Sequence, residues 1–142
     1  MKISTYHTIV RYSAVYDILA TLPFAIPIFA SFYLSQLGSI QSALGFSGII
    51  PNFEPLHLFF INLLGAIVMV WSAYRIRHTQ SILGFYDGIA RFLFAGLMLF
   101  YLVNYQVAGI VWLFFVPELS WGIIQIVGYS KIDAGRSDEA LR

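Results

Sequence analysis

Four long apolar stretches constrain the fold of this chain more than any other feature. Each contains about 20 residues or more, the length that an α-helix needs to cross a hydrocarbon core of about 30 Å. Hydrophobic residues make up 59% of the sequence and charged residues only 11%, a balance that a water-soluble domain could not carry on its surface. The sequence therefore predicts an all-α polytopic membrane protein, in which one four-helix transmembrane domain fills residues 1–130 and a short tail follows at 131–142. The predicted helices are 9–34, 55–75, 83–103 and 107–128.

The basic residues predict the orientation of this bundle. All eight Lys and Arg fall on one side once the four helices are drawn, and the outer segment 35–54 and the turn near 104–106 contain none. The positive-inside rule then places both termini in the cytoplasm, and we expect the plasma (inner) membrane as the location. A formal net charge of only +1 gives no reason to expect a nucleic-acid partner.

Three ionisable residues lie well inside these stretches, each in a different one: Asp17, Arg91 and Glu118. At a rise of about 1.5 Å per residue, Asp17 and Arg91 lie about 12 Å from the cytoplasmic ends of their helices, and Glu118 lies about 15 Å from its own. A charge in hydrocarbon costs on the order of 3 kcal/mol or more, so such side chains usually face the bundle interior and pair there. The sequence therefore predicts one buried charged layer shared by three helices.

This charged layer has a chemical and a structural interpretation. An arginine between two carboxylates satisfies one of them and leaves the other free to accept a proton, so Asp17 and Glu118 are the candidate proton-transfer groups. The competing interpretation is an ion-pair network that only fixes the register of the helices. Spacing along the helices places further side chains in or near the layer as candidate ligand-binding residues: Asn62, Asp87, Arg91, Trp121 and Gln125.

The outer segment 35–54 also permits two interpretations. It is rich in glycine and serine, which favours a loop resting on the lipid head groups. Its apolar residues recur at a roughly helical spacing, which favours a short interfacial helix that covers the bundle. Pro23 and Pro27 predict a kink in the outer half of the first helix.

The cysteine and histidine content of the sequence does not predict a metal centre. The chain has no cysteine, which removes thiolate ligands and cysteine nucleophiles. Its histidines, His7, His57 and His78, lie at heights that differ by most of a membrane, so they do not form one site. His57 and Glu54 open the second helix; they either bond to the adjacent loop or form a rim pair that acts as a general base or metal ligand. The sequence predicts no metal site and identifies no cofactor.

The layout also resembles a known group of membrane proteins. Asp17 in the first helix, the segment 54–57 opening the second, and Glu118 with Trp121 in the fourth carry the likeness. On these residues the chain resembles the DoxX-like and EXPERA-type small four-helix membrane proteins, through the layout of the whole chain rather than a diagnostic string. The EXPERA-type group includes sterol isomerases and sterol-binding members, so the resemblance implies a hydrophobic ligand beside buried carboxylates.

Three functions are compatible with these features, and all take the lipid bilayer as a partner. The first is binding, or chemical modification, of a small hydrophobic molecule such as an isoprenoid, a quinone or a sterol-like lipid, and it requires an open cavity at the charged layer. The second is an accessory or assembly role among other membrane subunits, or in a homo-oligomer, with a purely structural layer. The third is a small proton-coupled transporter, which the one-sided distribution of basic residues disfavours.

Overall fold

The computed structural model describes the backbone of residues 1–140 and the side-chain surroundings of residues 1–132. This part of the chain is helical almost throughout, and its β-pairing is limited to a single bridge between Ile49 and Val107. The predicted all-α class is therefore confirmed. The elements are α1 (Ile3–Ala25), α2 (Pro27–Ala43), α3 (Pro55–Arg77), α4 (Ser81–Tyr105), the 3₁₀ turn η1 (Gly109–Val111) and α5 (Trp112–Ala140).

Three helical segments in the described part are long and apolar enough to cross a membrane: Pro55–Arg77, Ser81–Tyr105 and Gly109–Ile132. A fourth crossing is available if α1 and α2 together form one bent span. The bounds of α3 and α4 agree with the predicted ones to within two residues. The last helix starts later than predicted, because Gln106 has a left-handed φ of 48° and η1 precedes α5. α5 then continues through most of the predicted tail, whose residues 141–142 lie outside the described part.

The prediction of one continuous first helix over 9–34 is wrong. α1 ends at Ala25, Ile26 is extended, and α2 leaves at an angle of 95°. Pro27 explains the break: proline disfavours the helical conformation in the residue before it, and its missing N–H suits the first position of a new helix. Pro23 lies within α1 without ending it. The predicted kink is thus a complete change of direction.

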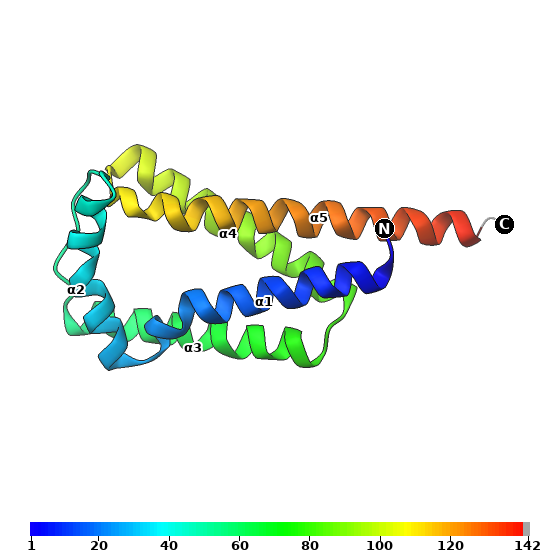
Figure 1. The fold of residues 1–142 in the computed structure, drawn as a ribbon, viewed down its shortest axis with the longest axis horizontal. Coiled ribbons are helices and arrows are strands. Elements are labelled where there is room, and N and C mark those ends of the chain that lie inside the picture. The colour runs from blue at the N-terminus through cyan, green and yellow to red at the C-terminus, as the bar shows by residue number, and fades with distance from the viewer. Residues whose placement is uncertain (141–142) are drawn as a thin grey trace.

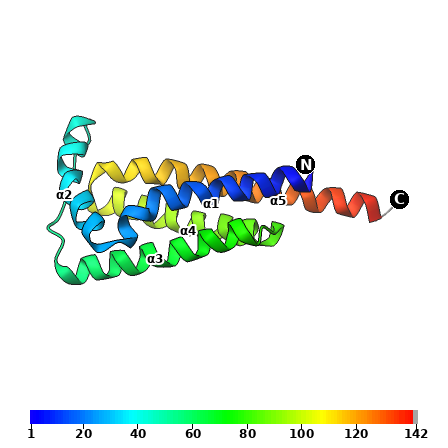
Figure 2. The same ribbon diagram turned by 60° about the horizontal axis from the view of Figure 1, so that its bottom comes forward.

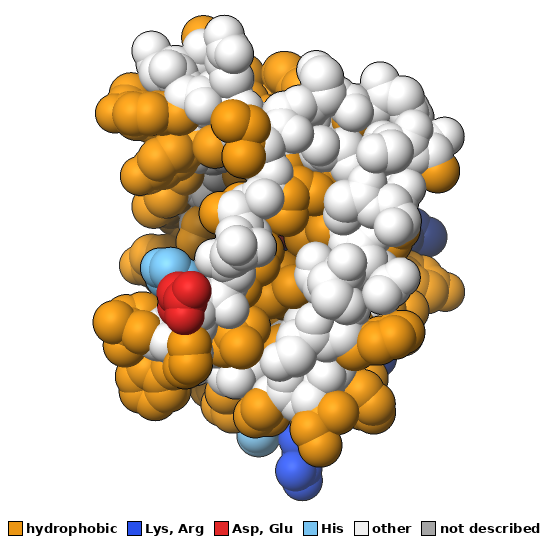
Figure 3. Space-filling model, turned by 90° about the vertical axis from the view of Figure 1, so that its left-hand side faces the viewer, with side chains coloured by type: hydrophobic (Ala, Val, Ile, Leu, Met, Phe, Trp, Pro, Cys, Tyr) orange, Lys and Arg blue, Asp and Glu red, His pale blue; other side chains and the backbone are white. Residues whose placement is uncertain are grey.

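The helix α2 occupies the first half of the outer segment that permitted two interpretations. It runs to Ala43, so residues 35–43 are helical and only the remainder up to Glu54 is a loop with a turn. α2 lies across the end of the bundle and contacts α1, α3 and η1 (Figures 1 and 2). Figure 3 looks onto this end, where apolar side chains predominate and few charged ones are visible.

Two residues of α3 hold the break between α1 and α2 in place. The Asn62 side-chain amide donates a hydrogen bond of 2.8 Å to the carbonyl of Phe24, in the last turn of α1. One turn further along α3, a Cβ on Gly65 would lie only 2.6 Å from the backbone nitrogen of Ala25. Glycine is therefore needed at position 65, because the backbone of α1 passes directly over it.

The helices are arranged as two closely packed pairs. α1 packs along α3, and α4 packs along α5, whereas the backbones of α3 and α4 stay apart although a short link joins the two helices. α1 also contacts α4 and α5 and so connects the two pairs. The start of α1 and the described end of α5 lie at the end of the bundle opposite α2 (Figure 1). The incomplete closure between α3 and α4 leaves room for the site described next.

Candidate functional site

Five charged side chains from four helices meet inside the bundle. Four of them are almost inaccessible, with exposed fractions of 7% or less, and the fifth, Glu118, is partly accessible. Such burial in a membrane-spanning bundle is tolerable only when the charges neutralise one another. The five are Asp17 of α1, Arg75 of α3, Asp87 and Arg91 of α4, and Glu118 of α5.

Arg91 occupies the position that the sequence predicts, between Asp17 and Glu118. Its Nη2 lies 2.7 and 2.6 Å from the two oxygens of Asp17, and its Nη1 lies 3.0 Å from Oε2 of Glu118. Its Nε donates to Oδ2 of Asp87, one helical turn earlier, at 3.0 Å. Charge-assisted hydrogen bonds of this kind are about twice as strong as neutral ones. One guanidinium therefore joins α1, α4 and α5.

Arg75 is the second cation of the layer, and the sequence analysis missed it. It is fully buried and donates to both Asp17 and Asp87, with further bonds to the hydroxyls of Ser72 at 3.1 Å and Ser13 at 3.3 Å. Arg75 is the last residue of the predicted helix 55–75, a position typical of an ordinary basic residue at the membrane surface. A count of charges could have found it, since three buried acids are not balanced by Arg91 alone.

Asp87 is the most heavily hydrogen-bonded of the acids. Besides the two arginines, it accepts from the indole Nε1 of Trp71 at 2.9 Å and from the side-chain amide of Gln125 at 2.8 Å. Gln125, which is fully buried as well, also donates to Ser13 at 2.8 Å. Asp87 and Gln125, two of the predicted ligand-binding residues, thus lie in the network rather than beside it.

Glu118 differs from the other two acids. Its only recorded partner in the described part is Arg91, through Oε2, and its side chain is 17% exposed. Asp17 and Asp87, by contrast, each accept from both arginines. The layer contains three carboxylates but only two guanidiniums. Glu118 is the carboxylate that is bonded through one oxygen, Oε2, only. This asymmetry matches the predicted division into one satisfied acid and one available acid.

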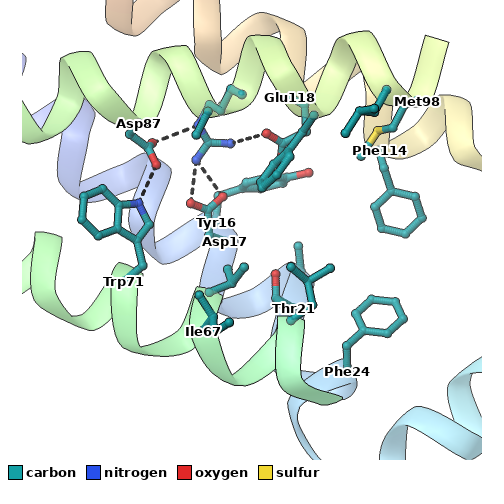
Figure 4. Close-up of a pocket in the computed structure, with 17 residues that line it drawn as sticks. Tyr16, Asp17, Thr21, Phe24, Ile67, Trp71, Asp87, Met98, Phe114 and Glu118 are labelled. Atoms are coloured by element: carbon teal, nitrogen blue, oxygen red, sulfur yellow. Dashed lines mark hydrogen bonds and ion pairs between the residues drawn. The ribbon is translucent and has the colours of Figure 1, made fainter. Parts of the chain in front are cut away.

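A pocket of about 510 Å³ adjoins this available carboxylate. Figure 4 shows the ion pairs at one end of the pocket and Phe24, Met98 and Phe114 at the other. The hydroxyls of Tyr16 and Thr21 are further polar groups in a wall that is otherwise largely apolar. Four helices contribute residues at helical spacing: Asp17, Ala20, Thr21 and Phe24 from α1, Leu64, Ile67, Val68 and Trp71 from α3, Asp87, Ala90, Arg91, Phe94, Leu97 and Met98 from α4, and Phe114 and Glu118 from α5.

Comparison with known proteins identifies no relative. No protein-family model, curated protein or solved structure matches this chain.

The structure does not bring the remaining predicted residues to the pocket wall. Trp121 packs behind it, with its ring centroid 6.3 Å from that of Tyr16. Asn62 bonds to the end of α1 instead. Glu54 and His57 cap the first turn of α3, where the backbone N–H of Glu54 donates to Nδ1 of His57 at 3.1 Å. These side chains have structural partners that spacing along a helix could not reveal.

Proposed function

We propose that this chain is an integral protein of the plasma (inner) membrane that binds a small hydrophobic ligand, such as an isoprenoid, a quinone or a sterol-like lipid, beside Glu118. The observation that supports this proposal is a largely apolar pocket that ends on a carboxylate with an uncommitted oxygen. Its volume of about 510 Å³ lies in the range of known small-molecule sites, which are mostly apolar with a few polar groups that orient the ligand.

The two candidate proton-transfer groups have different roles in this proposal. Asp17 accepts hydrogen bonds from two guanidiniums and serves to hold the helices together. Glu118 is the group that meets the ligand, either by accepting a hydrogen bond from it or by exchanging a proton with it. Arg91 lies between them and keeps Glu118 oriented towards the pocket.

The proposed topology has four crossings, with α1 and α2 together forming the first, and both termini in the cytoplasm. The support comes from charge distribution and shape. Residues 27–54, which form α2 and the following loop, contain no Lys or Arg. The start of α1 and the described end of α5 lie at the opposite end of the bundle (Figure 1). Lys2 and Arg11 lie at or near the start of α1, Arg77 ends α3, and Lys131 lies in the second half of α5.

Native mass spectrometry of the mildly detergent-extracted protein, followed by lipid extraction, tests the ligand proposal. We expect the wild type to carry one small hydrophobic molecule, and Glu118→Gln to lose it. The amide keeps the shape of the side chain and equalises the carboxylates and guanidiniums, so the bundle should remain folded. Glu54→Gln is the matched control, because it makes the same chemical change at a helix cap away from the pocket.

Two results would contradict the proposal. One is a ligand that Glu118→Gln retains as firmly as Glu54→Gln does. The other is a wild type that carries no small molecule but holds a protein partner stoichiometrically, which would make the chain an accessory subunit and the ionic layer its internal brace.

A further inference from the structure

The pocket has a packed floor and an open side. Its floor is α1, which packs closely along α3 and also contacts α4 and α5. Its open side lies between α3 and α4, whose backbones stay apart and whose side chains meet at the polar end, where Trp71 and Arg75 bond to Asp87. Beyond these bonds, where the α3 and α4 backbones stay apart, the pocket communicates with whatever surrounds the bundle on that side.

Apolar side chains surround this opening. Leu64, Ile67 and Trp71 lie one above another on the face of α3 that lines the pocket, and Phe94 and Leu97 lie on the corresponding face of α4. Ile67 is 66% exposed and Leu97 is 58% exposed, although both line the pocket. Large apolar side chains that line a pocket and are also exposed mark its mouth.

The mouth lies at the depth of the hydrocarbon core. Ile67 is near the middle of the spanning helix Pro55–Arg77, and Phe94 is near the middle of Ser81–Tyr105. Water is absent at that depth on the outside of a bundle, so the mouth of the pocket faces the acyl chains of the bilayer. A ligand that passes through it must already be dissolved in the bilayer.

The pocket also has a direction. Trp71, Asp87 and Glu118 lie at its polar end, and Phe24, Met98 and Phe114 lie at its apolar end (Figure 4). The α1 floor from Asp17 to Phe24 spans about 10 Å at the helical rise. An occupant therefore aligns with its polar group towards Glu118 and its hydrocarbon part towards the α2 end of the bundle.

We infer that the ligand is a chain-bearing amphiphile of the bilayer that enters sideways between α3 and α4, with its polar group at Glu118 and its chain among Phe24, Met98 and Phe114. This inference rests on the proposed ligand-binding function and adds the route, the orientation and the chemical class of the occupant.

Fluorescence quenching by brominated lipid tests the side opening. The chain has three tryptophans, so Trp112→Phe with Trp121→Phe leaves Trp71, in the pocket wall, as the single reporter. The protein is reconstituted into phosphatidylcholine vesicles whose acyl chains carry bromine at mid-chain. A plugged variant adds Ile67→Phe and Leu97→Phe at the mouth. The control variant adds Val70→Phe and Leu93→Phe, which lie on the same two helices, are 72% and 63% exposed and do not line the pocket.

We expect brominated chains to quench Trp71 in the single-tryptophan protein and in the control variant, and the plugged variant to lose this quenching. Equal quenching in the plugged and control variants would overturn the side opening, as would the absence of quenching in the single-tryptophan protein. Circular dichroism on all three confirms that they are folded.

A titration with dodecanol, followed by native mass spectrometry, separates failure of the route from failure of the function. If dodecanol binds and depends on Glu118 while plugging leaves quenching unchanged, only the side opening is wrong. If dodecanol does not bind at all, the proposed ligand-binding function fails and the inference fails with it.

Discussion

The polar and apolar ends of the pocket are held together in different ways. At the polar end, side chains from α1, α3, α4 and α5 are joined by ion pairs and hydrogen bonds, and Asp87 alone accepts from four side chains. At the apolar end, α3 and α4 separate and α1 breaks at Ile26. Here one hydrogen bond, from Asn62, and the close approach at Gly65 secure the break.

This difference shows what joins helices in a lipid environment. Lipid chains solvate apolar side chains as well as another helix does, so apolar contact alone gives little reason for two helices to close. Where the ionic layer ends, α3 and α4 remain apart, and a cavity results beside the last carboxylate. The network and the pocket are thus two consequences of one arrangement, and substitutions at each end should affect different properties.

Removing Arg75 should have the largest effect. Arg75→Ala leaves Asp17 and Asp87 with one cation between them and should lower the free energy of unfolding by about 3–5 kcal/mol. Unfolding by SDS in mixed micelles measures this loss. Arg77→Ala, at an exposed position two residues later, should change stability by less than about 0.5 kcal/mol. Equal losses in the two variants would show that the ionic layer does not hold the polar end.

At the apolar end, Gly65→Ala should be the most damaging small change. The new methyl group would meet the α1 backbone at about Ala25, and relieving this overlap should cost about 1–3 kcal/mol in the same unfolding assay. Gly96→Ala is the matched control on α4, since a Cβ there meets nothing within 4 Å. It should be neutral or stabilising by up to about 1 kcal/mol. A neutral Gly65→Ala would mean that α1 does not need its close approach to α3.

The excess carboxylate should make the pocket selective for the charge of the polar group. We expect dodecanoate to bind at least about tenfold more weakly than dodecanol at neutral pH, a difference of about 1.4 kcal/mol, because it brings a second uncompensated negative charge to Glu118. Titrations monitored by native mass spectrometry compare the two. The preference should shrink in Glu118→Gln; a preference that is unchanged in this variant would assign it to another group.

The smallest effect is expected at the cap of α3. His57→Ala removes the acceptor of the Glu54 backbone N–H, an exposed interaction worth about 0.5–1 kcal/mol. Ligand retention should not change, because neither residue lines the pocket. Loss of the ligand in His57→Ala, with the fold intact, would instead support the interpretation of Glu54 and His57 as a functional pair.

The sequence predicts the all-helical class, the bounds of two helices and the meeting of three charged residues, for identifiable reasons. Apolar length predicts α3 and α4 to within two residues, and the cost of a buried charge predicts that Asp17, Arg91 and Glu118 meet. These inferences depend on the geometry of the α-helix and on the cost of placing a charge in the membrane, and both apply at every position of the chain.

The errors arise where partners from distant segments decide the outcome. Hydropathy cannot distinguish a straight 9–34 helix from two helices at a right angle, although Pro27 marks the break. Arg75 looks like an ordinary basic residue at a helix end until two acids of other helices meet it. Trp121 shares a face with Glu118 by spacing, yet Tyr16 comes between it and the site. The placement of Arg75 and Trp121 thus depends on tertiary contacts that a single helix does not encode.

The ionic layer also constrains how the chain is made. Asp17 is synthesised early, but its partners Arg75 and Arg91 follow 58 and 74 positions later. α1 qualifies as a spanning segment only in combination with α2, so its acid makes it a weakly inserted helix until those cations arrive. α1 is therefore synthesised before α3 and α4, but its buried acid is paired only after they follow. A nascent chain that stops before α4 contains Arg75 but lacks Arg91, so it has only one of the two cations that pair with Asp17.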